Sequence, residues 1–381
     1  MIDQSILSEY NSVRTTEHKD TLCHAPFTNM NFAQNGDATA CCYNRTHVLG
    51  TYPANNVDEM WHGQKAQELR AYLKANVLPA GCEPCALQLL SRNFGGLRAR
   101  SFDYVASAKY PEKDGRFVPK PQMMEFEISN VCNLECTMCN GFFSSSIRRH
   151  RERLPALKSP YDMAFVEQLE PFIPHLSQAK FLGGEPFLIR TYYRIWDMLI
   201  RLNPGVQVSI TTNGTTLNQR VTDILEKLQA HIVVSVDSLE KENYERIRVN
   251  ADFDTVMQNV RYYREYARRR NTGVTFAVCP MQQNWRELPT FLTQCNEFGI
   301  NLFFNTVTWP EEVALQFLSR DELSAVIQHL KSVKLTDKSD VQRGNNANYC
   351  DLIQQVIYYR DNPQIPQEIE GILTLPTVEI A

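Results

Sequence analysis

Residues 123–139 read MMEFEISNVCNLECTMC, and this stretch decides the fold. Its first part, Met123–Ile128, is short and rich in apolar residues, which is typical of a buried β-strand. Cys132, Cys136 and Cys139 follow the strand at the spacing C-x3-C-x2-C. Three thiolates so close together can hold one face of an iron–sulfur cluster, which normally takes four ligands, so one iron would keep an open position. Two alternatives remain: a zinc site completed by a distant histidine, or three buried thiols that pack as small apolar side chains.

Beyond this stretch, short apolar runs alternate with amphipathic segments, which is the pattern of βα units that build a parallel sheet. Six units can be counted, with strands expected at Met123–Ile128, Ala179–Leu182, Gln207–Thr211, Ile232–Val236, Val274–Cys279 and Leu302–Thr306. Six units are too few for a closed eight-fold barrel. The sequence therefore predicts an α/β fold, an open partial (β/α)6 TIM-like barrel with its site at the carboxyl ends of the strands.

The chain divides into three parts. The polar, basic stretch 101–120 shows little apolar periodicity and predicts a linker, so we place a boundary near residue 115. After Pro310 we expect a helix at Asp321–Leu330 and a short apolar helix at Leu352–Tyr359. The predicted parts are an N-terminal domain with its linker (1–115), the barrel (116–310) and a C-terminal helical extension (311–381).

The overall composition excludes several classes of protein. A chain of 381 residues is long enough for two or three domains, so it is no small disulfide-stapled scaffold. Its 39 Lys and Arg against 43 Asp and Glu give a net charge of −4, so no basic excess favours nucleic acid or an anionic membrane surface. There is neither a run of about 18 apolar residues nor a secretory signal, and we expect a cytoplasmic protein. In a reducing compartment, its eleven cysteines indicate metal binding or catalysis.

Three further motifs follow the next predicted strands in order. They are FLGGEP at 181–186, TTNG at 211–214 and SVDS at 235–238. Together with the three-cysteine loop, they strongly resemble the radical S-adenosylmethionine (radical SAM) enzymes over about residues 120 to 310. The resemblance implies that Cys132, Cys136 and Cys139 hold a [4Fe-4S] cluster whose open iron is chelated by the amino and carboxylate groups of S-adenosyl-L-methionine (SAM).

The same resemblance implies a set of SAM-binding residues. Gly183 and Gly184 would leave room for the methionine amine, because a Cβ would block its approach, and Glu185 would be a charge partner. Arg248 matches an arginine near the SAM carboxylate, with Arg246 as an alternative. Met138 stands where the family usually has an aromatic residue beside the adenine. The full set is Met138, Gly183, Gly184, Glu185, Thr212, Ser235 (at the ribose), Arg248 and Val307 (at the adenine).

Four cysteines before the barrel form a second pattern. Cys23 and Cys41 are spaced C-x12-G-x4-C, and Cys82 and Cys85 form a CxxC pair. The pattern resembles the auxiliary-cluster domain called SPASM, in its shorter form called twitch, although that domain usually follows the barrel. The resemblance implies that these four cysteines bind a second [4Fe-4S] cluster, with a hairpin turn at Gly36-Asp37 and with Trp61 in the core. Cys42 is an alternative to Cys41 that would break the G-x4-C spacing, and a zinc ribbon is the alternative to the cluster.

In radical SAM enzymes, reductive cleavage of SAM gives a 5′-deoxyadenosyl radical that abstracts a hydrogen atom from the substrate. The resemblance thus implies an enzyme of oxidoreductase or isomerase type, with an electron donor such as flavodoxin or ferredoxin. Because an auxiliary cluster can accept an electron, oxidative modification or epimerisation of a peptide is the first expectation. The same chemistry on a carbohydrate or other small molecule is the alternative, and a non-catalytic metal-binding scaffold is an alternative of another class. Cys279 and Cys350 are candidate hydrogen donors.

Overall fold

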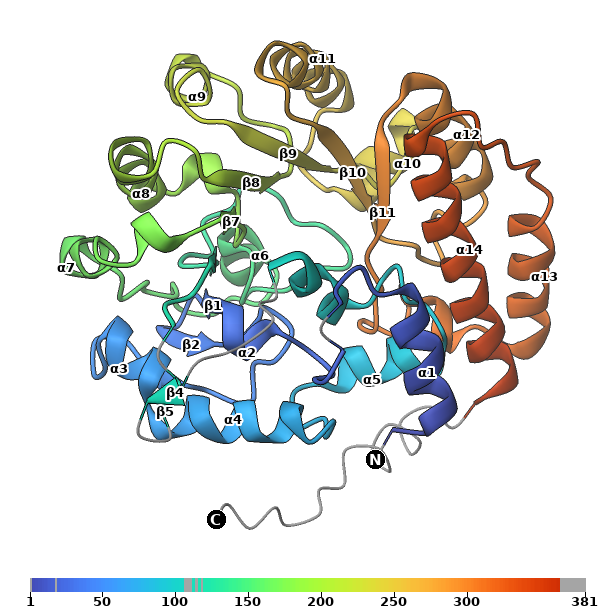
Figure 1. The fold of residues 1–381 in the computed structure, drawn as a ribbon. Coiled ribbons are helices and arrows are strands. Elements are labelled where there is room, and N and C mark those ends of the chain that lie inside the picture. Colours follow the sequence, from blue (N-terminus) through green and yellow to red (C-terminus); the bar gives the residue numbers. More distant parts are fainter. Residues whose placement is uncertain (1, 18, 106–111, 114–115, 118, 364–381) are drawn as a thin grey trace.

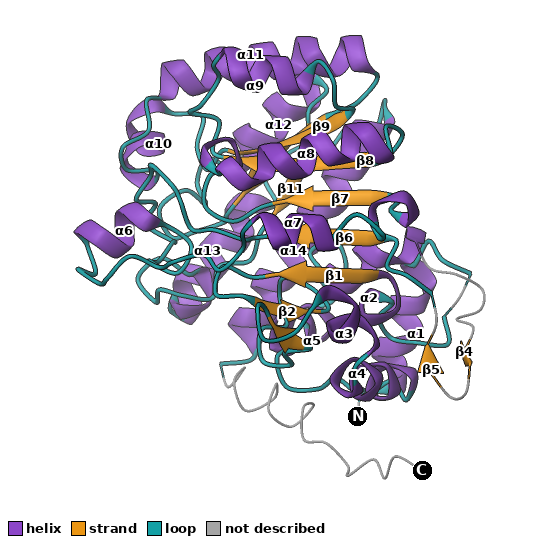
Figure 2. Cartoon of the chain, turned by 90° about the vertical axis from the view of Figure 1, so that its left-hand side faces the viewer, coloured by secondary structure: helices purple, strands orange, loops and turns teal. Residues whose placement is uncertain are grey.

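Six parallel strands form part of a barrel, with helices on its outer side (Figure 1). The computed structural model describes residues 2–17, 19–105, 112–113, 116–117 and 119–363. The strands are β6 (Met123–Phe126), β7 (Gln178–Phe181), β8 (Gln207–Thr212), β9 (Ala230–Ser235), β10 (Val274–Val278) and β11 (Asn301–Phe304). Each expected strand is present within one or two residues, and neighbours in sequence pair in parallel. The prediction of a partial (β/α)6 barrel is confirmed. Because the six strands are parallel, their carboxyl ends lie on one side of the molecule, the side to which the arrow of β7 points in Figure 2.

The helices between the strands bury one face against the sheet. In α8, for example, Ile195, Trp196 and Leu199 are fully buried at helical spacing. These helices are α6 (Ser145–His150), α7 (Met163–Gln168), α8 (Arg190–Leu202), α9 (Gln219–Leu225), α10 (Lys241–Ile247), α11 (Phe253–Arg270) and α12 (Leu288–Phe298), with short 3-10 turns η2 (Ile173–His175) and η3 (Pro186–Leu188). Within the described residues, we find no helix that combines the length and the apolar character needed to cross a membrane.

The N-terminal part adds strands to the same sheet. β1 (Asn29–Phe32) pairs in parallel with β6, and β2 (Asp37–Thr39) and β3 (Gly50–Thr51) follow in antiparallel order. Gly36 has φ +100°, and a Cβ there would lie 2.5 Å from a backbone oxygen, so the predicted hairpin turn requires glycine. Trp61 is fully buried, as expected. The helices of this part are α1 (Gln4–Val13), α2 (Ala25–Thr28), α3 (Val57–His62), α4 (Gln64–Lys74) and α5 (Glu83–Leu90).

The predicted linker is wrong for residues 101–105. They belong to the 3-10 helix η1 (Arg98–Val105), whose Phe102 is fully buried and whose Asp103 forms a buried ion pair with Arg14 at 2.7 Å. These two contacts fix the segment although its sequence has no regular apolar spacing. Farther on, β4 (Glu112–Lys113) pairs with β5 (Arg116–Phe117), while 106–111, 114–115 and 118 lie outside the described residues. The boundary near residue 115 stays a prediction.

The C-terminal extension covers the last strand of the sheet. The expected helix α13 (Arg320–Leu330) is present, but α14 spans Asp340–Asp361 and is far longer than the helix expected at 352–359. Two asparagines in its polar first half bond to β11: the Leu302 N–H donates to the buried Asn345 Oδ1 at 2.7 Å, and Asn348 Nδ2 donates to the Leu302 carbonyl at 2.9 Å. These asparagine side chains thus bond to backbone groups of β11 that a neighbouring strand would otherwise pair with. A short turn, η4 (Leu315–Phe317), precedes α13.

Candidate functional site

The three-cysteine loop lies at the carboxyl end of β6, where two polar side chains from other loops contact its thiols. Asn213 Nδ2 lies 3.9 Å from Cys132 Sγ, and Arg248 Nη1 lies 3.8 Å from Cys136 Sγ. A tight turn joins the last two cysteines, since the Cys139 N–H donates to the Cys136 carbonyl at 3.1 Å. Burial raises the pKa of Cys132 to about 11 and that of Cys139 to about 12, and the neighbouring thiols add to both shifts. The structure thus brings the three predicted cysteines into one electrostatically coupled group.

The two glycines after β7 are required by contact between loops. The Gly184 N–H donates to the Ser129 carbonyl at 3.0 Å, and the Glu185 N–H donates to the Val131 carbonyl at 2.7 Å. A Cβ on Gly184 would lie 2.2 Å from the Val131 oxygen, and Gly183 has φ +105°. Any larger residue would therefore push the cysteine loop away from β7.

Glu185 joins the loops after β7 and β8. Its carboxylate is fully buried and accepts hydrogen bonds from the Asn213 N–H at 2.7 Å and from the Thr212 hydroxyl at 2.8 Å. Burial raises its pKa to about 7, although these hydrogen bonds act in the opposite direction. Thr212 and Glu185, both predicted as site residues, are therefore in direct contact.

A buried ion pair joins the loop after β9 to the cysteine loop. Arg248 Nη2 lies 2.7 Å from Asp237 Oδ2, and the Cys279 N–H donates to Asp237 Oδ1 at 2.7 Å. Burial alone would lower the pKa of Arg248, but Asp237 and Cys136 raise it above its ordinary value. The sequence analysis did not assign Asp237 a role; its signal was a charged residue directly after a buried strand.

An apolar cluster lies beside these charges. Met138, Cys279 and Val307 pack against a small buried cluster, which consists of Ile247, Met281 and Val313. The structure therefore brings together the two side chains that were expected beside an adenine. Burial raises the pKa of the Cys279 thiol well above its ordinary value, so the thiol is neutral near pH 7.

Two predicted residues differ in their placement. Ser235 is the last residue of β9 and shares a sheet face with Val233, which lines the interior of the barrel. Cys350 is exposed on α14, in a groove with Leu330 and Val333. The structure does not bring Cys350 to the other site residues.

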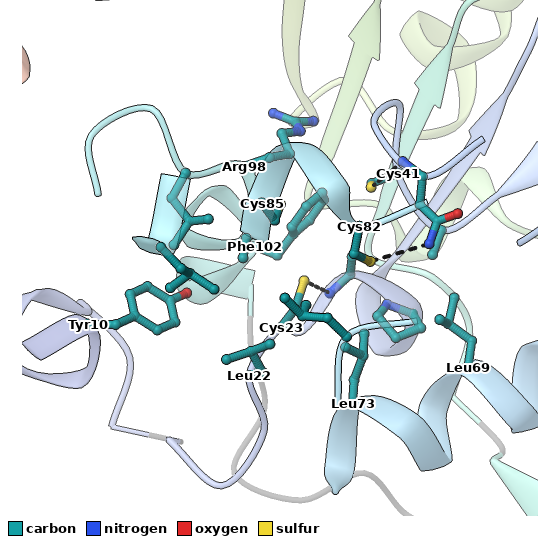
Figure 3. A pocket seen from close by; sticks show the side chains of 18 residues that line it. Tyr10, Leu22, Cys23, Cys41, Leu69, Leu73, Cys82, Cys85, Arg98 and Phe102 are labelled. Carbon is teal, nitrogen blue, oxygen red and sulfur yellow. Dashed lines mark hydrogen bonds between the residues drawn. The ribbon is translucent and has the colours of Figure 1, made fainter. Parts of the chain in front are cut away.

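A second group of thiols encloses a cavity of about 30 Å³ in the N-terminal part. Figure 3 shows Cys23, Cys41, Cys82 and Cys85 around this space, with mostly apolar side chains and Arg98 completing the wall. Asn44 Nδ2 donates to Cys82 Sγ at 3.3 Å, and burial raises the pKa of Cys23 to about 12. Among the described residues, no three His, Cys, Asp or Glu side chains are placed to hold a single metal ion.

Cys42 faces a different space. It does not line the thiol-lined cavity but contributes to a larger cavity, of about 520 Å³, inside the barrel. The strands supply inward-facing residues to this barrel cavity: Lys180, Ser209, Thr211, Val233, Ala277 and Phe303. Leu97 and Arg98, at the start of η1, line both cavities, so the two spaces share one wall.

Fold and site together define an α/β partial barrel with one group of three thiols and one of four. Comparison with known families matches residues 126–295 to the Radical SAM superfamily and residues 23–86 to SPASM, an iron–sulfur cluster-binding domain. The chain therefore carries a radical SAM domain within the barrel and a SPASM domain ahead of it. Its cofactors are SAM, the [4Fe-4S] cluster of the radical SAM domain and an auxiliary iron–sulfur cluster.

Curated relatives include a GTP 3′,8-cyclase of Vibrio parahaemolyticus, 29% identical over 196 residues, which are 50% of this chain and 55% of the relative. A GTP 3′,8-cyclase of Rhizobium etli is 26% identical over 262 residues, which are 64% of this chain and 68% of the relative. The chain thus spans about half the length of the first relative. Among solved structures, anSMEcpe with bound AdoMet has a TM-score of 0.42 at 16% identity, covering 55% of this chain and 59% of that one. Streptococcus suis SuiB with bound S-adenosylmethionine has a TM-score of 0.40 at 17% identity, covering 56% and 47%.

Proposed function

We propose that the chain is an enzyme that cleaves SAM reductively and abstracts a hydrogen atom from a substrate held in the barrel cavity. The observation that carries this proposal is the gathering, at one end of the parallel strands, of three thiols, the glycine loop and the Asp237–Arg248 pair. When bound, the cluster and SAM supply a 5′-deoxyadenosyl radical. The chain's own residues bind, orient and shield the reactants.

The residues at the barrel mouth fit a cluster with one open position. Cys132, Cys136 and Cys139 are the proposed ligands, and no fourth thiol belongs to this loop. Glu185 would face the amino group of SAM, and its three hydrogen-bond donors hold the carboxylate in place. Arg248 is held by Asp237, so it can orient a SAM carboxylate only with the guanidinium edge that Asp237 leaves free. The apolar group of Met138, Cys279 and Val307 would shield the adenine from water.

The four N-terminal thiols fit an auxiliary cluster. Cys23, Cys41, Cys82 and Cys85 are the proposed ligands, and the position of Cys42 in the barrel cavity supports Cys41 over Cys42. Since Leu97 and Arg98 line both the thiol-lined cavity and the barrel cavity, the auxiliary cluster would lie next to the substrate. This adjacency supports an oxidative reaction, for which a cluster held by these four thiols would supply an electron acceptor.

The barrel cavity favours a small-molecule substrate over a peptide. Its volume of about 520 Å³ lies in the range of small-molecule sites, about 300–1,000 Å³, and its walls are strands on one side and η1 on the other. The second candidate, a peptide, would place a single side chain in this space.

Anaerobic reduction of cluster-loaded protein with SAM tests the proposal. We expect 5′-deoxyadenosine and methionine, detected by mass spectrometry, from the wild type. The triple variant Cys132→Ala/Cys136→Ala/Cys139→Ala should form neither product. A fully cluster-loaded wild-type protein that leaves SAM intact would refute the enzyme proposal.

A further inference from the structure

The interior of the barrel holds two cavities that share part of their walls. A second cavity of about 560 Å³ lies at the amino ends of the strands, and Lys180, Ser209 and Val233 line both it and the barrel cavity. Lys180 lies on β7, three residues before Gly183 of the loop that follows, which is about 10 Å at 3.3 Å per residue. Its side chain therefore lies deep in the barrel, below the loop proposed to hold SAM.

The charges around Lys180 do not balance. Glu125 of β6 is fully buried, and its Oε1 pairs with Arg98 and lies 4.0 Å from Lys180 Nζ. Its other oxygen, Oε2, accepts a hydrogen bond from Asn29 Nδ2 at 3.1 Å. Two cations thus share one carboxylate oxygen, which leaves one positive charge without a partner inside the barrel.

Other titratable groups near the cavity do not supply the missing anion. Burial raises the pKa of the Cys42 thiol, which lines the cavity and stays neutral. Arg45 pairs with Glu127, so these two charges cancel. Arg100 also lines the cavity, where it donates to the Phe94 carbonyl at 3.1 Å, and Asp351 is its nearby acidic neighbour.

The ammonium group of Lys180 has few acceptors among the described residues. The lysine side chain is 15% exposed, and the one ion pair that it forms with the described residues, to Glu125, lies at the limit of contact. Burial and the Arg98 cation lower the pKa of Lys180 well below its ordinary value. A buried ammonium group without close acceptors is costly, and an anion bound beside it would offset that cost.

We propose that Lys180 and Arg98 bind an anionic group of a small-molecule substrate, a carboxylate or a phosphate, inside the barrel. This inference rests on the proposed function, because it assigns the substrate class of the same cavity. The guanidinium group of Arg98 offers paired donors in one plane, and the ammonium group of Lys180 offers a point charge. The positive charge and the donor geometry of these two groups suit a carboxylate as well as a phosphate. The bound anion would also lie beside the wall of the auxiliary-cluster cavity, since Arg98 belongs to that wall.

Binding of inorganic phosphate and of succinate to the cluster- and SAM-loaded protein tests this proposal, by calorimetry at constant ionic strength. We expect at least one probe to bind the wild type, and Lys180→Met to weaken it by about tenfold or more. Lys180→Arg should retain binding, and Lys227→Met, which removes an exposed lysine at the end of α9, should leave it unchanged. Tighter binding of phosphate than of succinate assigns a phosphate site, and the reverse order assigns a carboxylate site.

A second variant keeps the test decisive if Lys180→Met fails to fold. Ser209 is the register partner of Lys180 on β8, so Ser209→Asp would place a fixed carboxylate about 5 Å from the lysine strand. We expect this variant to lose probe binding and to melt at a higher temperature than the wild type. A lower melting temperature, or wild-type probe binding in Lys180→Met, would overturn the anion site. Formation of 5′-deoxyadenosine is measured separately, so a failed anion site and a failed enzyme proposal give different results.

Discussion

The backbone N–H of Asn213 donates a hydrogen bond to Glu185 Oε2 at 2.7 Å, and this bond fastens the loop after β8 to the loop after β7. Asn213 also reaches Cys132 through its side chain, so one residue links the acid, the glycine loop and the first thiol. The site is therefore a set of strand-end loops that bond to each other before any cofactor is considered.

The first prediction concerns the pH dependence of the cluster-free chain. The pKa of Glu185 is about 7 in the folded state, above its ordinary value of 4.5, so folding favours the protonated acid. Its stability contribution is fully present below pH 4.5 and is lost as the pH rises through 7. The difference is at most about 3 kcal/mol. Urea denaturation between pH 5 and pH 8 measures it, and Glu185→Gln should show a smaller loss of stability than the wild type. Parallel pH profiles for the two proteins would contradict the prediction.

The second prediction concerns the contact between the glycine loop and the cysteine loop. Gly184→Ala places a Cβ against the Val131 oxygen, so we expect a loss of about 1–3 kcal/mol and weaker SAM binding. Gly205→Ala is the matched control, because a Cβ there meets nothing within 4 Å, and it should change stability by less than about 0.5 kcal/mol. Denaturation midpoints and SAM titration measure both variants. Equal effects at the two glycines would disprove the steric argument.

The third prediction concerns the number of clusters. Anaerobically reconstituted wild type should contain about eight irons and eight acid-labile sulfides per chain, from two [4Fe-4S] clusters. The triple variant at Cys132, Cys136 and Cys139 should retain about four of each. A triple variant that holds only zinc would mean that the N-terminal thiols form a zinc site, and the oxidative proposal would be withdrawn.

The fourth prediction separates two adjacent cysteines. Cys41→Ala removes a thiol from the small N-terminal cavity, so it should lower the iron content by up to about four per chain. Cys42→Ala removes a thiol from the barrel cavity and should keep the full iron content. Iron analysis, together with absorbance in the charge-transfer bands of the clusters, distinguishes the two variants. The reverse result would make Cys42 the ligand.

The fifth prediction concerns the C-terminal helix. Asn345→Ala leaves the buried Leu302 N–H without its acceptor, which should cost about 1–3 kcal/mol of stability. Cys350→Ala, at an exposed position five residues farther along the same helix, is the control and should change stability little. Chemical denaturation compares the two. The Cys350 variant also tests its role as a hydrogen donor, since unchanged turnover would exclude that role.

The barrel strands could be predicted from sequence because buried parallel strands leave short apolar runs between helices. The cysteine loop and the GGEP segment could be predicted because their spacing follows the chemistry of one local loop. The first half of helix α14 was not predicted, since Asn345 and Asn348 contact β11 through hydrogen bonds and leave no apolar pattern. The 3-10 helix η1 was read as linker for a related reason: Phe102 and Asp103 make long-range contacts that no local periodicity reveals.

Charged residues inside the barrel were the other omission. Lys180 sits between Ala179 and Phe181 in a strand chosen for its apolar residues, and only the barrel's curvature shows that it points inward. Asp237 was quoted within a motif, but its partner Arg248 lies on the far side of α10, so the pair becomes visible only after folding. Local sequence patterns thus located the loops of the site. The ion pairs between charged residues of different loops could not be predicted, because they form only in the folded chain.

The sheet does not close on itself, so its two ends decide how copies of the chain behave toward one another. At β3, the end strand is only two residues long, which is too short to template a partner strand. At β11, the asparagines of α14 occupy the backbone groups that a second copy would need. The helix therefore covers that edge of the sheet, and because β3 is too short to pair, loss of residues 340–361 would expose one edge, which allows two copies to pair through β11 and then leaves no edge for a third.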